Sequence, residues 1–305
     1  MTEIDYGQFH EWLEQARAAN TANTANTTDS DARWELLRRF QEEWGYQPAP
    51  EEPKPYVSRL GAADPQVPDE DEDEDEAEAE ADAGADGPQD VDPSLAVPAA
   101  LSEWWGLSFN SFADRPEVYE TNPVWPPTVR PDPTGYGVAG GLPEGNAFAG
   151  PEEDLRVCVF MAENQYCNEW GYAAARAGLA DPQVLVSGLD EEGRPTWVLQ
   201  SHSVSEFFLQ LAVTRLPADH GWMVEEGVAD PGVADRVRAS LRPMGFLPWL
   251  ELGAHTEYFG GLDVIVALNS GYGDSELVAY GRTAEAMERL AETLGLDWTD
   301  WLSDV

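Results

Sequence analysis

The segment LRVCVFM, residues 155–161, has the composition of a buried central strand. Its apolar residues fall on both faces of an extended chain, as expected where a sheet is covered on both sides. Leu155, Val157, Val159 and Met161 are predicted on one face, with Cys158 and Phe160 on the other. We therefore expect a mostly buried strand here.

A helix is predicted at residues 203–216. Residues 203–206, SVSE, match a capping box, in which the serine hydroxyl accepts a hydrogen bond from the glutamate backbone and the glutamate carboxylate accepts one from the serine backbone. The apolar residues that follow lie on one stripe of a helix, namely Val204, Phe207, Phe208, Leu211 and Ala212.

Further elements complete an α+β pattern. The last helix is expected to begin at Thr283 and to end at Gly295, which suits a left-handed C-terminal cap. The other expected strands span residues 183–187, 196–200, 262–268 and 276–280, and the other expected helices span residues 6–18, 31–44 and 95–105. Without strict βαβ alternation, this order predicts an α+β fold with a mainly antiparallel central sheet, flanked by helices and preceded by a helical N-terminal extension.

Composition divides the chain into three parts. Residues 1–47 hold two amphipathic pieces, the second with Asp31 as its expected N-cap, and we favour docking of their apolar faces on the main domain over faces that await a partner. Residues 48–92 are Pro-rich and then acidic, and are predicted to be a disordered linker because they offer too little apolar surface to offset chain entropy. Residues 93–305 form the expected α+β domain, with a Pro-rich loop at residues 115–133.

The charge balance is strongly negative. The chain has 58 acidic and 17 basic residues, a formal net charge of −41, and only twelve of the acids lie in the run at residues 69–86. Such a field repels nucleic acid and lipid headgroups and attracts basic proteins. We therefore expect a basic protein as partner, with no nucleic acid and no membrane. A GC-rich genome would account for the arginine excess over lysine, and a salt-loving source would equally account for the acidity.

Few signals point to targeting, metal or redox chemistry. The sequence has no window of about 18 apolar residues and no signal-peptide pattern at its start, so a cytoplasmic protein is expected. Cys158 and Cys167 do not form a C-x-x-C motif and are expected to be reduced thiols. The four histidines are never three or four residues apart, so no metal site is predicted.

A set of short features in a fixed order resembles the SUKH superfamily. These features are Glu163-Asn164-Gln165 after the central strand, Trp170-Gly171, Asp181-Pro182-Gln183-Val184, Trp197 and the capped helix from Ser203, and residues 258–283 look like the C-terminal half of many actinobacterial-type members. The resemblance implies a sheet-and-helix fold that binds proteins, most often as an immunity protein that neutralises a polymorphic toxin. Some members are regulatory interaction modules. The chain departs from the family at residues 104–106 and in the long loop of residues 115–149.

Candidate partner-binding residues lie in three places. Glu163, Asn164 and Gln165 follow the buried strand, where satisfying backbone groups at the strand end is the favoured role, ahead of partner contact and of catalysis. Trp125 lies between prolines, where an exposed interface anchor and a packed ring are equally open. Trp104 and Trp105 lie at the edge where the chain departs from the family. By contrast, the tryptophans at 170, 197 and 249 are expected in the core.

These observations favour a binding protein over an enzyme. Ser203 has no G-x-S-x-G context, and no phosphate-binding glycine motif occurs, so no catalytic residue, cofactor or metal is predicted. The first hypothesis is an immunity protein that occludes a toxin, which could be a nuclease with a basic groove. The second is a regulatory or scaffolding module, which deletion of residues 1–92 would separate from the first. The third is a hydrolase, which a pocket with converging carboxylates of split pKa would favour. The sequence sets no oligomeric state.

Overall fold

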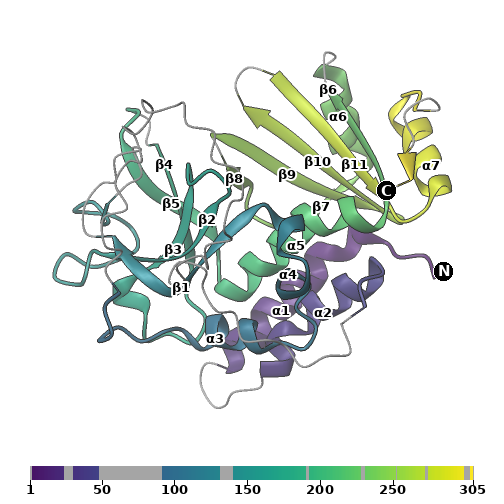
Figure 1. Cartoon of the computed structure of the whole chain (residues 1–305). Helices are drawn as coiled ribbons and strands as arrows, with labels where there is room; N and C mark the ends of the chain where they lie inside the picture. Colours follow the sequence, from purple (N-terminus) through teal and green to yellow (C-terminus); the bar gives the residue numbers. More distant parts are fainter. Residues whose placement is uncertain are drawn as a thin grey trace, which may run out of the picture.

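The computed structural model describes residues 2–23, 30–47, 91–130, 140–189, 192–227, 231–251, 253–271, 274–298 and 303–304. Within these ranges, helices and antiparallel strands build an α+β fold, as the sequence predicts. The strands form two sheets and not one central sheet, with the first sheet at the left of Figure 1 and the second at the upper right. Apart from its last two residues, the linker predicted at residues 48–92 lies outside the described residues.

The first sheet has the strand order β1-β2-β3-β4-β5, and each neighbouring pair is antiparallel. Its strands are β1 (Thr121–Arg130), β2 (Val157–Glu163), β3 (Glu169–Ala173), β4 (Val184–Leu189) and β5 (Pro195–Ser201). The predicted central strand is β2, which is buried along its whole length. A register shift between Val159 and Met161 breaks the alternation of faces, so Met161 packs in the main core while Val159 packs on the opposite face. The prediction that these two residues share a face is therefore wrong.

Strand β1 occupies much of the loop predicted at residues 115–133. It lies at the edge of its sheet, and its pairing with β2 is interrupted between Pro123 and Thr128. Proline has no N–H to donate, so a sheet tolerates it at an edge strand or at a bulge. The loop prediction is wrong because proline excludes a central strand but not an edge strand.

The second sheet has the order β12-β6-β11-β10-β9-β7, with β8 paired to β9. Its strands are β6 (Trp222–Gly227), β7 (Arg242–Pro243), β8 (Trp249–Glu251), β9 (Ala254–Gly261), β10 (Val264–Gly271), β11 (Asp274–Gly281) and β12 (Ser303–Asp304). The predicted hairpin is β10–β11. Helices α6 (Pro231–Ser240) and α7 (Ala284–Leu294) cover one face of this sheet through a separate apolar cluster. As predicted, Thr283 caps α7 and Gly295, at φ 64°, ends it.

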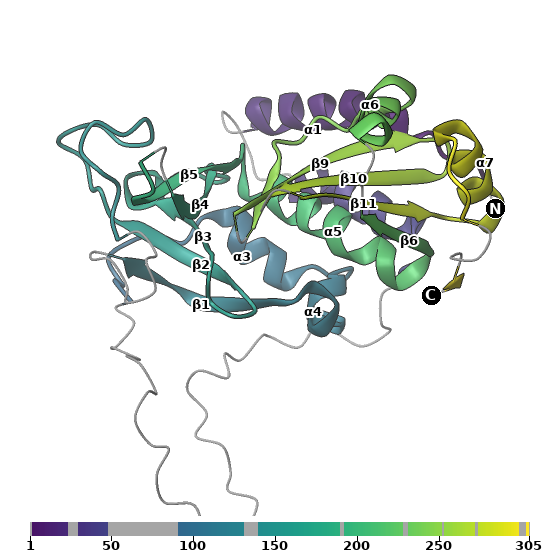
Figure 2. The same ribbon diagram turned by 90° about the horizontal axis from the view of Figure 1, so that it is seen from above.

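Helix α5 (Val204–His220) lies at the centre of the molecule and runs along the second sheet in Figure 2. Ser203 caps it by accepting a hydrogen bond from the Glu206 backbone at 3.1 Å, as predicted. The Glu206 carboxylate, which the capping-box prediction assigns to the serine backbone, accepts hydrogen bonds from Arg17. The helix is buried on nearly every side and not along one stripe, because both sheets and the N-terminal helices contact it.

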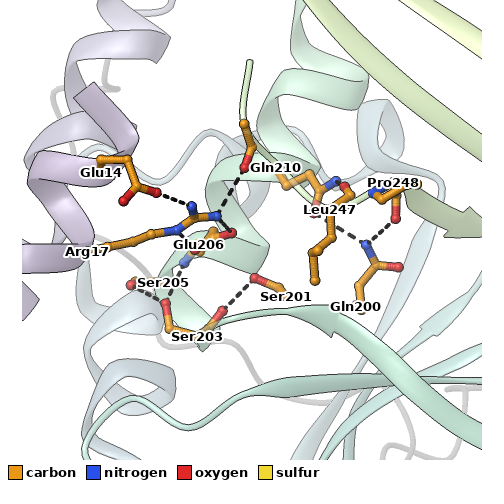
Figure 3. Close-up of polar contacts among 11 residues, drawn as sticks. Glu14, Arg17, Gln200, Ser201, Ser203, Ser205, Glu206, Gln210, Leu247 and Pro248 are labelled. Atoms are coloured by element: carbon orange, nitrogen blue, oxygen red, sulfur yellow. Dashed lines mark hydrogen bonds and ion pairs between the residues drawn. The ribbon is translucent and has the colours of Figure 1, made fainter. Parts of the chain in front are cut away.

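The N-terminal helices belong to the same core. They are η1 (Tyr6–Gln8), α1 (Phe9–Asn23) and α2 (Ser30–Glu43), so Asp31 lies inside its helix and is not the predicted N-cap. The side chains that they bury in the main core are Tyr6, Phe9, Leu13, Trp34, Leu37, Phe40 and Trp44. The predicted docking of this segment is confirmed. Figure 3 shows the hydrogen-bonded ion pair between α1 and α5, which Arg17 and Glu206 form.

Short helices connect these parts. They are α3 (Ala99–Gly106), α4 (Ser111–Asp114), η3 (Pro116–Tyr119) and η4 (Ala174–Arg176). Helix α3 begins four residues later than the predicted start at Leu95, because Pro98 lies at its N-cap and cannot donate a hydrogen bond from inside a helix.

Candidate binding groove between the two sheets

A groove of roughly 620 Å³ lies between the turn after β2, the side of α5 and the second sheet. The residues that line it are Glu120, Glu163, Asn164, Gln165, Thr214, Arg215, Met223, Glu225, Trp249, Glu251, Ala254, Thr256, Tyr258, Ala267, Asn269, Glu276, Val278 and Tyr280. Its volume falls within the range of about 300–1,000 Å³ that is typical of ligand sites. The groove is therefore large enough to admit a few side chains of a partner.

One wall of the groove is the face of the second sheet that α6 and α7 leave uncovered. Side chains alternate along a strand, so Glu276, Val278 and Tyr280 of β11 share this face. Helix α5 covers only part of it, where the Thr214 hydroxyl lies 2.8 Å from the Tyr258 hydroxyl. Beyond that contact, the ends of β6, β10 and β11 remain open to the groove.

The charge inside the groove is unevenly balanced. Five of the lining residues are glutamates, and Arg215 is the one cation among the described lining residues. Its guanidinium lies 3.0 Å from the Glu120 carboxylate and 3.0 Å from that of Glu251. Glu251 also accepts a hydrogen bond of 2.7 Å from the indole of Trp249. One arginine charge thus offsets one of the two negative charges on the α5 side of the groove.

The sheet wall carries two carboxylates without such a partner. Glu225 of β6 is opposite Val278 in the ladder, so it is the diagonal neighbour of Glu276 on the same face. Burial, a hydrogen bond with Glu276 and repulsion from its charge together raise the pKa of Glu225 above its usual range. Within the described ranges, no arginine or lysine forms an ion pair with either carboxylate.

Next to this pair lies an unsatisfied acceptor. Asn269 of β10 is directly opposite Glu276 in the ladder. Its side-chain oxygen Oδ1 is fully buried and has no hydrogen-bond partner in the described part of the chain. A buried acceptor without a donor costs stability, and because this atom is closed to solvent it does not face the groove.

The sequence-predicted turn forms the rim of the groove. The Glu163 carboxylate accepts hydrogen bonds from the backbone of Gln165 at 2.9 Å and of Cys167 at 3.2 Å, which is the structural role favoured from the sequence. Asn164 and Gln165 are exposed and line the groove. Tyr166, the next residue, is 46% exposed. The turn therefore holds its backbone with one side chain and presents the others to solvent.

The three other candidate residues lie elsewhere. Trp104 is buried and stacks on Phe208 with ring centroids 3.6 Å apart. Trp105 contacts Trp104 and also Trp125, at 4.5 Å and 5.9 Å between ring centroids. Trp105 and Trp125 are partly buried against the main core, and none of the three lines the groove. The structure thus brings the three tryptophans together outside the groove.

Sequence reasoning missed the carboxylates of the sheet wall. Glu276 begins the predicted strand at 276–280 and is followed by four apolar residues, so no alternation of polar and apolar residues marks its face. Its neighbour Glu225 lies on β6, a strand that the sequence analysis does not predict. The proximity of the two carboxylates results from pairing between strands about 50 residues apart, which no local pattern encodes.

Other kinds of site find no support in the described residues. No group of three or more His, Cys, Asp or Glu side chains there is arranged to hold a metal ion. No helix in the described part of the chain is long and apolar enough to span a membrane. Cys158 is buried, Cys167 is exposed, and both are free thiols.

Comparisons with family models, with curated proteins and with solved structures gave no match to this chain. The SUKH resemblance stays a prediction.

Proposed function

We propose that this chain is a binding protein that captures a basic protein partner by taking a cationic segment of that partner into the acidic groove. The observation that carries the proposal is the charge of the groove, where five glutamates face one arginine. Because Arg215 pairs only with carboxylates on the α5 side, the carboxylates of the sheet wall stay available for a cation from outside.

The net charge of the chain supports the same class of partner. A formal charge of −41 attracts basic proteins over long range and speeds their encounter. The exposed rim residues Asn164, Gln165 and Tyr166 can supply hydrogen bonds and an aromatic contact once the partner has arrived. Charge would govern the rate of encounter, and the groove would govern where the partner binds.

Within this class we propose an immunity protein that occludes a toxin, in keeping with the resemblance to the SUKH superfamily. A nuclease toxin suits the groove because such an enzyme needs a basic surface to hold nucleic acid. A glutamate-lined groove that binds this surface would compete with the toxin's own substrate. The chain would then inhibit the toxin without any chemical step.

The test is co-expression with the product of a toxin gene adjacent to the gene for this chain, followed by a measurement of affinity and of toxin inhibition. Asn164→Lys with Gln165→Lys adds two positive charges at the rim, and is expected to weaken binding about tenfold or more. The matched control is Glu35→Gln with Glu42→Gln on the exposed face of α2, which makes the same change of charge away from the groove. Equal effects of the two variants would refute the groove as the binding site.

A hydrolase is the second candidate, because the groove holds the converging carboxylates that this hypothesis requires. The raised pKa of Glu225 is typical of a carboxyl that shares a proton with its neighbour. Glycosidase carboxylates stand about 5 Å or more apart, whereas these two contact each other, so a peptidase-like dyad is the closer analogy. Turnover of a peptide substrate by the native chain that Glu276→Gln abolishes would establish this alternative.

A further inference from the structure

We propose that the part of the groove around Tyr280, Glu225 and Glu276 binds a small amino sugar, a ligand that carries a protonated amine beside hydroxyl groups. This inference goes beyond the proposed function, because it needs no protein partner.

Tyr280 of β11 brings an unpaired hydroxyl to the groove. The residue is only 8% exposed and lines the groove. Within the described residues its hydroxyl forms no hydrogen bond, and this oxygen is not closed to solvent. The Tyr258 hydroxyl, by contrast, lies 2.8 Å from the hydroxyl of Thr214, which donates in turn to the Gln210 backbone. A nearly buried polar side chain that is left unpaired at a groove is a group that a ligand can satisfy.

The Tyr280 hydroxyl lies between an anion and a cation. On the ladder, Glu225 is opposite Val278, so it is the diagonal neighbour of Tyr280 as well as of Glu276. Burial raises the pKa of Tyr280 to about 12, while the charge of Arg215 lowers it and that of Glu225 raises it. The hydroxyl therefore keeps its proton at neutral pH and can both donate and accept a hydrogen bond.

A ligand hydroxyl matches this position better than a charged group does. It can accept a hydrogen bond from the Tyr280 hydroxyl and donate one to the Glu225 carboxylate. An ammonium has no acceptor to offer the Tyr280 proton. A ligand carboxylate would be repelled by Glu225, and the guanidinium of Arg215 already pairs with Glu120 and Glu251.

The carboxylates beside Tyr280 require a positive charge as well. Glu225 and Glu276 contact each other, and two negative charges there repel unless a proton or a cation lies between them. An ammonium would remove this repulsion and form charge-assisted hydrogen bonds.

An amino sugar carries both groups on one small ring. It can therefore reach the Tyr280 hydroxyl and the carboxylate pair together. Met223, directly opposite Tyr280 on β6, and Val278 also line the groove and offer apolar surface to the C–H groups of the ring. The site thus combines a hydroxyl, two carboxylates and an apolar floor.

The test uses the full chain and three probes of similar size. Glucosamine has the amine and the hydroxyls, glucose lacks the amine, and cyclohexylamine lacks the hydroxyls. Ligand-observed NMR titrations at about pH 6, where the amines are protonated, measure the affinities. We expect glucosamine to bind about fivefold or more tightly than either of the other probes. Affinity for glucosamine no greater than that for cyclohexylamine, or no greater than that for glucose, would overturn the proposal.

Variants locate the site. Tyr280→Phe is expected to weaken glucosamine about fivefold or more and to leave cyclohexylamine unchanged, because only the sugar meets the phenol hydroxyl. The matched control is Tyr166→Phe, which removes a hydroxyl from an exposed tyrosine that does not line the groove. Glu276→Gln is expected to weaken both amines. Equal losses of glucosamine affinity in the two tyrosine variants would overturn the site. Circular dichroism of each variant verifies the fold.

The outcomes separate this inference from the proposed function. Glucosamine binding that depends on Tyr280, together with no capture of a basic protein, would support the amino-sugar site and refute the function. Capture of a basic toxin by a chain that binds no glucosamine would support the function and refute the amino-sugar site.

Discussion

Arg17→Met is expected to destabilise the fold by about 3 kcal/mol, because it leaves a buried carboxylate without its partner. Nε and Nη2 of Arg17 donate to the two carboxylate oxygens of Glu206 at 2.9 Å and 2.6 Å (Figure 3). The Glu206 side chain is 4% exposed and that of Arg17 is 23% exposed. Breaking a buried pair costs about 3–5 kcal/mol, and the partial exposure of Arg17 favours the lower end.

Differential scanning calorimetry measures this loss. For a chain of this size, about 3 kcal/mol lowers Tm by about 6–12 °C. The control is Arg38→Met, whose guanidinium pairs with Glu35 and Glu42 on the exposed face of α2. Exposed pairs of this kind contribute less than about 1 kcal/mol.

A second variant isolates the buried charge as the cause. Adding Glu206→Gln to Arg17→Met removes the unpaired charge and is expected to restore part of the lost stability. If Arg17→Met lowers Tm no more than Arg38→Met does, the pair between α1 and α5 does not stabilise the fold, and the reasoning is refuted.

The remaining predictions concern packing, thiol reactivity and pH. Gly171→Ala should cost about 2 kcal/mol or more in urea unfolding, since its Cβ would lie 2.6 Å from the Cys158 carbonyl oxygen, whereas Gly178→Ala meets nothing within 4 Å and should change little. Burial raises the pKa of the Cys158 thiol to about 11, so a thiol reagent at neutral pH should label the exposed Cys167 first and Cys158 only on unfolding; equal rates would contradict this. Glu276→Gln should be more stable than the native chain at pH 7 but not at pH 3. It removes the charge next to Glu225, whose raised pKa in the folded state means that stability falls as pH rises from the unfolded pKa through the folded one. A gain that persists at pH 3 would assign the effect to something other than charge.

Elements with a strong local signal are predictable from the sequence. The apolar run of β2, the cap of α5 at Ser203 and the cap and terminal glycine of α7 each depend on residues close together in the chain. The elements that cannot be predicted are those that depend on pairing between residues far apart in the chain. Strand β6 has two acidic residues in its sequence WMVEEG and becomes a strand by pairing with β11.

The candidate site likewise has one part with a local sequence signal and one part that depends on long-range pairing. The turn at Glu163 was found because it follows directly on a recognisable strand. Glu225 and Glu276 form a pair only because β6 and β11 are neighbours, so a sequence with 58 acidic residues gives no reason to single them out.

Burial of the N-terminal helices also changes one experiment. Deleting residues 1–92 would remove Trp34 and Phe40 from the main core, so it would unfold the protein before it could separate a toxin inhibitor from a scaffold. Replacing residues 48–90 with a neutral Gly/Ser segment of equal length tests the same question and leaves the described core residues of the N-terminal helices in place. A toxin inhibitor should retain its activity in that replacement.

The N-terminal segment meets the turn between β9 and β10. The Ile4 backbone donates to the Asp263 carboxylate, 259 residues further on, and Asp5 forms an isolated bridge with Leu262. At about 5–20 residues per second, a ribosome would take roughly 13 to 52 s to make the strand that this segment joins. Throughout that interval the aromatic side chains of α1 would have left the exit tunnel without the surface that buries them. Early residues such as Phe9 are therefore where a chaperone would be expected to bind the nascent chain.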